Sequence, residues 1–433
     1  MRLSRTSYEG AFRPGATGIV HLGIGAFARA HQAVFTEEAM AATGDDRWGI
    51  CGATMRGPAV AEQLGPQDGL YSVRAGGDLR VVGAVTEVLR PGDDLLTDRL
   101  AAPGTQVVTV TITEKGYRAG PAVDRLVRGL RARAAADAGP ITVLSCDNLP
   151  SNGARLANLV RAAAEPWLLG WIGEQVRFPC TMVDRIVPAS TPADLAEAAA
   201  RLGLEDRGAV VAEPFLQWVI EDDFAAGRPA WEKAGALLVA RAGPYEVMKL
   251  RLLNGSHSAL AYLSAREHVA QALGELRPAL VRLMDEVTPT LGELDGVDLG
   301  AYKASLLERF ANPELRHRTA QIAADGSQKL PQRLLDPARE LLAAGREPRW
   351  IALVVAGWMA HVSTAAAVDD PLAGRLRVTG DAARVAGRLL AVREVFGEDL
   401  PEHAGFRELV TEALERIMAE GTVATVRAYL SVP

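Results

Sequence analysis

Hydrophobic and polar positions follow one pattern up to Gly243 and a different pattern after it. Before Gly243, short apolar runs end at glycine, proline or polar residues and alternate with segments of helical periodicity. Such runs predict buried strands, and strands separated by helices predict an α/β fold with a parallel sheet. The predicted strands and extended segments are Ile19–Ile24, Trp48–Thr54, Leu70–Val73, Leu79–Val82, Gln106–Thr113, Ile141–Ser145, Phe178–Pro188, Val210–Glu213 and Leu237–Ala240.

After Gly243 the apolar residues recur at i, i+3 and i+4, with proline and glycine between the periodic segments. This spacing predicts amphipathic helices, and strand signals are nearly absent. The predicted helices are Leu250–Leu263, Val269–Val287, Leu299–Ala311, Gln332–Ala344, Trp350–Ala367, Ala382–Val395 and Phe406–Leu430. We therefore expect two domains, with an α/β domain over residues 1–243 and an all-α domain over residues 244–433.

Composition and charge narrow the classes of protein to which the chain can belong. Its 433 residues are enough for two domains, and 48% hydrophobic residues are typical of a soluble enzyme with a full-sized core. The net charge of −6 argues against a nucleic-acid or anionic-membrane binder. No apolar run reaches the roughly 18 residues of a membrane span, and residues 1–18 lack the apolar core of a signal peptide.

The cysteines add a prediction about the compartment. Cys51, Cys146 and Cys180 are far apart in the sequence and form neither a disulfide framework nor a CxxC metal pattern. A reducing compartment fits this usage, so we expect a cytoplasmic protein without a metal centre.

A glycine turn follows the first predicted strand. Gly23-Ile24-Gly25-Ala26-Phe27-Ala28 leads into a helical pattern that continues through Met40. This strand, turn and helix are the setting of the dinucleotide-binding fingerprint, in which Ala28 replaces the third glycine as a permitted variant. Gly23 would allow the tight turn, and Gly25 would let the backbone approach a pyrophosphate at the helix N-terminus. We therefore expect residues 23–28 to bind a nicotinamide dinucleotide.

The second predicted strand bears on which dinucleotide is bound. NAD-binding folds usually place an acidic residue after this strand, against the adenosine ribose. Here Met55-Arg56-Gly57-Pro58 follows, with no acid. Arg56 could instead meet a 2′-phosphate, or it could be a solvated loop arginine. We expect NAD as the cofactor, with NADP as the open alternative and Arg56 as a candidate cofactor-binding residue.

Polar residues follow three other predicted strands or extended segments, where ligands lie in open α/β sheets. Glu114 follows Gln106–Thr113, and Asn148 follows Ile141–Ser145. Asp184 lies within Phe178–Pro188 beside Arg185, with which a structural ion pair is the alternative interpretation. We expect Glu114 and Asp184 to bind the cofactor and Asn148 to donate a hydrogen bond to a developing oxyanion. The alternative role of Asn148 is a turn or helix cap.

The segment Lys249-Leu-Arg-Leu-Leu-Asn254-Gly-Ser-His257 places three polar groups in an apolar run. On an α-helix, Asn254 and His257 are i,i+3 neighbours, and Lys249 and His257 differ by about 80° around the axis. A partly buried lysine has a lowered pKa and can act as a general base, while an asparagine amide can hold an alkoxide. Separately, each residue has an ordinary structural role as a snorkelling lysine, a cap or a hydrogen-bonded histidine. Together they predict chemistry on a secondary alcohol and its ketone.

A polar stretch, Leu315–Pro331, interrupts the helical half and contains Arg318, Gln321 and Lys329. Its side chains suit a polyhydroxy or carboxylate ligand, and a solvated loop between helices is the alternative.

Five segments, taken in chain order, resemble the mannitol dehydrogenase family of polyol-specific long-chain dehydrogenases. They are Ile19–Gln32, Thr113–Tyr117, Ser145–Gly153, Met182–Pro188 and Lys249–His257. The resemblance implies a Rossmann-type N-terminal domain, an α-helical C-terminal domain and a metal-independent, nicotinamide-linked oxidation of a sugar alcohol or sugar acid. It also implies that Lys249 is the catalytic base, with Asn254, His257 and Asn148 beside it, and that Lys329 binds substrate.

Within that family, the segments Glu213–Asp222, Arg316–Thr319 and Gln321–Arg333 look closest to the fructuronate reductase, or D-mannonate oxidoreductase, branch. In the mannitol branch an arginine stands eight residues before the substrate lysine, where this chain has Gln321. The resemblance thus favours interconversion of D-mannonate and D-fructuronate, with Lys329, Arg318 and Gln321 near the substrate. The alternatives are a mannitol, arabinitol or sorbitol dehydrogenase and a non-catalytic NAD(H)-binding regulatory protein. The sequence leaves the oligomeric state open.

Overall fold

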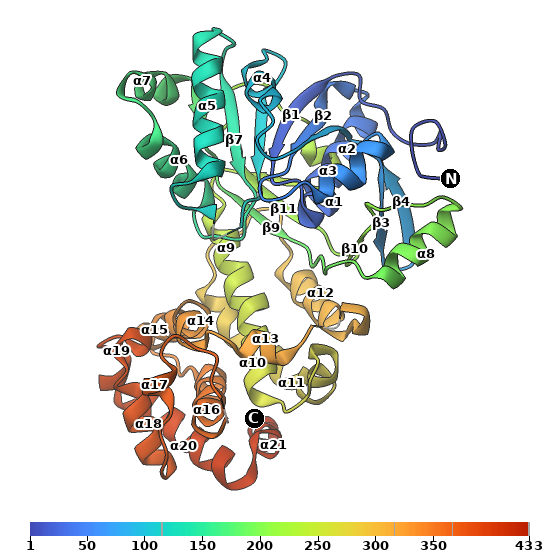
Figure 1. Ribbon diagram of the computed structural model, residues 1–433. Coiled ribbons are helices and arrows are strands. Elements are labelled where there is room, and N and C mark those ends of the chain that lie inside the picture. The colour runs from blue at the N-terminus through green and yellow to red at the C-terminus, as the bar shows by residue number, and fades with distance from the viewer. Residues whose placement is uncertain (114–115, 316, 366, 432–433) are drawn as a thin grey trace. The chain divides into compact units, whose positions relative to one another are not determined.

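The computed structural model describes residues 1–113, 116–315, 317–365 and 367–431 (Figure 1). The chain divides into two compact units, Met1–Gly243 and Pro244–Pro433. We call these the N-terminal unit and the helical unit and describe each by itself.

The N-terminal unit is built on a six-stranded sheet in the order β5-β2-β1-β6-β7-β8. Every neighbouring pair in this sheet is parallel. Its strands are β1 (Thr17–Leu22), β2 (Gly49–Ala53), β5 (Val85–Leu89), β6 (Val107–Val110), β7 (Ile141–Ser145) and β8 (Val176–Arg177). The chain leaves β1 toward β2 on one side and returns to β6 on the other, so the strand order reverses at β1. Ligands of open parallel sheets bind at the carboxyl ends of the strands beside such a reversal.

Alternating residues of β1 belong to two hydrophobic cores, one on each face of the sheet. Ile19 packs in one core with Phe35 of α2 (Gln32–Thr43). Val20 packs in the other core with residues of α4 (Leu95–Ala101), α5 (Pro121–Ala135) and α6 (Asn152–Ala163). Figure 1 shows α5 and α6 on one side of the sheet and α2 on the other. Helices thus cover both faces, which confirms the predicted Rossmann-type α/β fold.

Two three-stranded sheets complete the N-terminal unit. One has the order β10-β3-β4 and the other β12-β11-β9. Their strands are β3 (Tyr71–Ala75), β4 (Asp78–Val82), β9 (Thr181–Asp184), β10 (Val210–Ala212), β11 (Gln217–Glu221) and β12 (Leu237–Val239). The predicted hairpin is confirmed, because β3 and β4 pair antiparallel around Gly76, whose φ is +59°.

The described part of the helical unit contains helices and no strand, as predicted. Its main helices are α10 (Gly255–Leu263), α11 (Val269–Val287), α12 (Leu299–Ala311), α14 (Gly326–Leu330), α15 (Asp336–Ala343), α16 (Arg349–Thr364), α18 (Ala382–Leu390), α20 (Ala404–Glu420) and α21 (Thr422–Ser431). The predicted helix Phe406–Leu430 is in fact two helices, because Gly421 breaks it with a φ of +84°.

Two stretches of the helical unit are π-helices, at the starts of the predicted helices Leu250–Leu263 and Gln332–Ala344. They are η5 (Lys249–Asn254) and η8 (Pro331–Leu335), and they contact each other. Proline begins η8, and the missing N–H of Pro331 removes one α-helical hydrogen bond there. Lys249–Asn254 contains neither proline nor glycine, so its sequence gives no comparable signal. π-Helical turns occur frequently at functional sites.

A buried carboxyl group caps α16 and gives a prediction about stability. Glu286 of α11 accepts hydrogen bonds from the N–H groups of Trp350 (2.8 Å) and Ile351 (2.9 Å). Burial raises the pKa of Glu286 to about 7, against 4.5 for the ordinary group. The folded chain therefore binds a proton here that the unfolded chain has already lost, so the free energy of unfolding should fall as pH rises from about 4.5 to about 7.

The test is urea denaturation at several pH values across this window. Glu286→Gln should show a smaller fall in the free energy of unfolding than the wild type. An equal fall in both proteins would contradict the assignment of this pH dependence to Glu286.

Candidate active site

The glycine turn after β1 contains two glycines with different surroundings. Packing of the protein requires a glycine at position 23 but not at position 25. Gly23 has a φ of +97°, and a Cβ atom there would lie 2.0 Å from the carbonyl oxygen of Thr111. At Gly25 a Cβ atom would meet only the Gly23 carbonyl oxygen, at 3.7 Å. Gly23 is therefore needed for the fold, whereas the space beside Gly25 is open. An open space of this kind is what a pyrophosphate approaching the backbone needs, so the turn fits a dinucleotide.

The other residues of the turn divide into packing and open positions. Ile24 is buried, and its side chain occupies the space that a Cβ atom at Gly52 of β2 would need. Ala28 is also buried, within α1 (Ala26–Ala30). Ala26 and Phe27 are only half-buried. Ile24 and Ala28 thus hold the turn on the sheet, while Ala26 and Phe27 stay accessible.

The carboxyl ends of β2, β6 and β7 are tied together by hydrogen bonds. Arg56, after β2, donates from Nη2 to Thr113 Oγ1 (2.9 Å). Asp147, after β7, accepts from the N–H groups of Ile112 (2.9 Å) and Thr113 (2.8 Å). Arg56 is exposed and lies at this edge of the sheet. The candidate Glu114 lies outside the described residues.

The remaining candidates of the N-terminal unit differ in exposure. Asn148 follows β7 and is exposed, one residue after buried Asp147. Asn152 begins α6, and its buried amide donates to the carbonyl oxygens of Asp147 and Thr181. Asp184 is buried at the end of β9, in a three-stranded sheet and not in the six-stranded one. The cofactor-binding role of Asp184 stays a prediction.

In the helical unit, the π-helix changes the predicted geometry of Lys249 and Asn254. On an α-helix, residues five apart differ by about 140° around the axis. A π-helix bonds residue i to residue i+5, which brings residues five apart close to one above the other. The Gly255 N–H shows this pattern by donating to the Leu250 carbonyl oxygen. The π turn thus brings Lys249 and Asn254 nearer to one side of the helix than an α-helix would. Lys249 is buried and Asn254 is half-buried.

His257, on the following α10, is held as a neutral imidazole. Its ring is buried against Phe310 and His317, with centroids 4.8 and 4.9 Å away. Burial, followed by the interactions with His317, Arg333 and Arg309, keeps the pKa of His257 well below 6.5. Its Nε2 atom is buried and has no hydrogen-bond partner among the described residues. A neutral ring with an unused nitrogen can accept or donate one hydrogen bond to a ligand hydroxyl.

The three candidates from the polar stretch have different surroundings. Lys329 donates from Nζ to the carbonyl oxygens of Ile322 (3.2 Å) and Ala324, and burial beside Arg333 lowers its pKa. Arg318 is exposed and pairs with Glu267 at 3.1 Å. Gln321 is exposed. Substrate-binding roles for Lys329, Arg318 and Gln321 stay predictions.

The same stretch contains a residue that the sequence reasoning did not single out. His317 packs its ring against the ring of His257. Burial lowers the pKa of His317 below 6.5, so the imidazole of His317, like that of His257, favours its neutral form. A histidine next to two arginines gave no signal of this contact in the sequence, because its partner lies 60 residues earlier.

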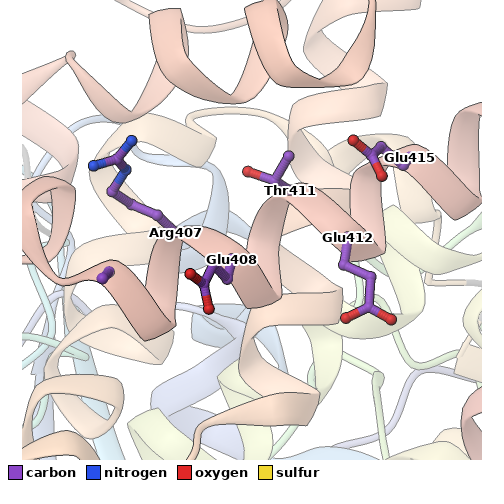
Figure 2. Close-up of a pocket in the computed structure, with 6 residues that line it drawn as sticks. Arg407, Glu408, Thr411, Glu412 and Glu415 are labelled. Atoms are coloured by element: carbon purple, nitrogen blue, oxygen red, sulfur yellow. The ribbon is translucent and has the colours of Figure 1, made fainter.

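Other features of the described chain do not suggest a second site. A surface pocket is lined by Ala404, Arg407, Glu408, Thr411, Glu412 and Glu415. Figure 2 shows these side chains along α20 alone, so no facing element encloses a ligand there. Within the described residues, no group of three or more His, Cys, Asp or Glu side chains could hold a metal ion. None of the described helices is long and apolar enough to cross a membrane.

Comparison with known proteins now identifies the family. Residues 17–233 match the mannitol dehydrogenase Rossmann domain, and residues 242–418 match the mannitol dehydrogenase C-terminal domain. The chain belongs to the mannitol dehydrogenase family. The resemblance seen in the sequence is thereby confirmed, and so is the prediction of an oxidoreductase that acts on a CH–OH group.

Individual members of the family differ in their similarity to the chain. It is 43% identical to the D-mannonate oxidoreductase of Escherichia coli K12, over 93% of each protein. It is 35% identical to a mannitol 2-dehydrogenase of Pyrenophora tritici-repentis, over 95% of the chain and 81% of the relative. The Pseudomonas fluorescens mannitol 2-dehydrogenase, solved as a ternary complex with NAD and D-mannitol, is 33% identical and has a TM-score of 0.79 over all of both chains.

Proposed function

We propose that this dehydrogenase interconverts a sugar acid and its keto form, most specifically D-mannonate and D-fructuronate. The observation that carries the proposal is the 43% identity to a D-mannonate oxidoreductase across nearly the whole chain. The mannitol 2-dehydrogenases compared above are less similar, at 35% and 33% identity. Gln321, where the mannitol branch is expected to have an arginine, supports the same choice.

The proposed cofactor is NAD, which the Pseudomonas fluorescens mannitol 2-dehydrogenase binds in its ternary complex. Gly23, Gly25 and the start of α1 would hold its pyrophosphate, and Arg56 lies where the adenosine end is expected. When bound, NAD would accept a hydride from the substrate carbon. NADP is the alternative, because no acidic residue follows β2 and Arg56 could pair with a 2′-phosphate.

In the oxidative direction, the proposed general base is Lys249 in its neutral form, which takes the proton of the substrate hydroxyl. Burial of this lysine supports the role, since removal from water disfavours the ammonium. Asn254, brought nearer to the side of Lys249 by the π turn, would donate to the developing alkoxide. Asn148 of the N-terminal unit is proposed as a second donor. His257, neutral and with a free Nε2, would orient the substrate hydroxyl.

A substrate panel tests the proposal directly. The purified chain is mixed with D-mannonate, other aldonates, mannitol, arabinitol or sorbitol, each with NAD and with NADP. Formation of reduced nicotinamide is followed by absorbance. We expect the highest kcat/KM for D-mannonate. A higher kcat/KM for an alditol would favour the polyol dehydrogenase, and NAD(H) binding without turnover of any substrate would favour a regulatory protein.

A further inference from the structure

Arg333 of η8 lies beside the candidate catalytic residues of the helical unit. From Nη1 it donates to the Asn254 carbonyl oxygen (3.4 Å) and to Ser258 Oγ (3.2 Å). Both contacts are long, and both acceptors are neutral. The Nε and Nη2 groups of Arg333 donate to no described residue of the helical unit. Most of the hydrogen-bonding capacity of this half-buried guanidinium is therefore unused.

Other buried arginines of the chain are satisfied in ways that Arg333 is not. Arg251, in the same unit, binds both carboxylate oxygens of Glu340 at 2.7 and 2.5 Å and the Thr290 carbonyl oxygen at 2.7 Å. Arg133 donates to five backbone carbonyl oxygens and has no need of a carboxylate. Arg133 thus has partners for all three of its nitrogens, and Arg251 has partners for both Nη groups, including a carboxylate. A purely structural role for Arg333 would lead us to expect a similar set.

The guanidinium of Arg333 itself also lacks a paired carboxylate in the described part of the helical unit. Among the described residues of the helical unit, no carboxylate lies within 4.0 Å of its guanidinium. Burial and then the charge of Arg333 lower the pKa of Lys329, four residues earlier, while Asp325, Asp369 and Asp370 act on Lys329 in the opposite direction. Burial is also the main cause of the lowered pKa of His257, and the charge of Arg333 adds to it. A partly desolvated positive charge without a counter-charge costs free energy. An anion in this place would remove that cost.

The position of Arg333 beside the candidate catalytic residues Asn254 and His257 indicates which class of anion would bind to it. Arg333 contacts the Asn254 carbonyl oxygen and its charge acts on His257, so a ligand held by the Asn254 side chain and His257 Nε2 would lie near the guanidinium. An arginine fork matches a carboxylate in a planar, bidentate way. We propose that Arg333 binds the carboxylate of an aldonate or keto-acid substrate through Nε and Nη2 and so selects sugar acids over alditols. The proposal rests on the proposed function and adds the residue that sets its specificity.

The experiment compares the wild type with Arg333→Gln and with Arg346→Gln, which removes one positive charge from an exposed position of the same unit. D-mannonate and D-mannitol are assayed with NAD, and binding of D-mannonate is measured separately by calorimetry with NADH present. Arg333→Gln should raise KM for D-mannonate by a factor on the order of 100, with a smaller change in kcat. Its kcat/KM for D-mannitol should stay within about threefold of wild type. Arg346→Gln should behave as wild type.

The possible outcomes separate this proposal from the proposed function. Equal losses on both substrates would overturn the proposal, because they would assign Arg333 to support of the Asn254 backbone. Unchanged D-mannonate kinetics would also overturn it, while the proposed function stands. If the wild type prefers D-mannitol, both fail. If the wild type binds D-mannonate without oxidising it and Arg333→Gln abolishes binding, the proposed function fails and the carboxylate site stands.

Discussion

Replacement of Lys249 by alanine is expected to lower kcat by a factor on the order of 10²–10⁴. The amine is buried at the start of the π-helix, which ends at Asn254, and the neutral His257 follows on α10. Lys249 is the single lysine of the segment 249–257, so its removal leaves no second amine there to take the proton. Turnover is measured with D-mannonate and NAD under saturating conditions.

The control for this prediction is Lys233→Ala, which removes an exposed lysine of the N-terminal unit. Both variants should bind NADH as tightly as wild type, as judged by its fluorescence, because Lys249 is not part of the glycine turn. Circular dichroism and the melting temperature show whether the buried substitution keeps the fold. A folded Lys249→Ala variant with wild-type turnover would contradict the role of the amine as base.

Gly25→Val is expected to weaken binding of NADH by a factor on the order of 100, or about 2.7 kcal/mol, without unfolding the protein. The backbone at Gly25 is extended, with a φ of −82°, and protein atoms leave the Cβ position open. Only a ligand that approaches the backbone would meet the new side chain. The measurement is a fluorescence titration with NADH, together with urea denaturation of the free protein.

Gly23→Ala provides the matched comparison in the same turn. Its Cβ atom would meet the Thr111 carbonyl oxygen, and its φ of +97° is unfavourable for alanine. The free energy of unfolding should fall by about 3 kcal/mol or more. If Gly25→Val instead destabilised the protein and left the affinity for NADH unchanged, the turn would have a structural role only.

Elements with a strong and continuous pattern were predicted well from the sequence. The predicted strand Ile141–Ser145 and the helices Val269–Val287 and Leu299–Ala311 coincide with β7, α11 and α12. Burial on one or both faces imposes a periodicity on such segments that local sequence alone reveals. Sheet membership was harder, because the extended segment Phe178–Pro188 does not reveal which strands will pair with it.

Local backbone geometry at the candidate site was not predictable from periodicity. Lys249–Asn254 has the composition of an ordinary α-helix, and the element that its π turn contacts, η8, lies some 80 residues later. His317 and Arg333 were missed for a related reason. Their significance comes from neighbours distant in the sequence, such as His257 and Asn254, and not from the spacing of residues around them.

The π-helix at Lys249–Asn254 also sets a limit on the length of the chain at this point. A π turn is an α-helix that has accommodated one additional residue, and each residue of an α-helix turns the chain by about 100°. Deletion of a single residue among 250–253 would let the segment relax to a regular α-helix. Lys249 and His257 would then keep nearly the same relation around the helix axis, because the π turn had absorbed the deleted residue. Relaxation to an α-helix at the present length would instead rotate the amine relative to the imidazole by about that angle, so the wide turn and the number of residues in it are fixed together.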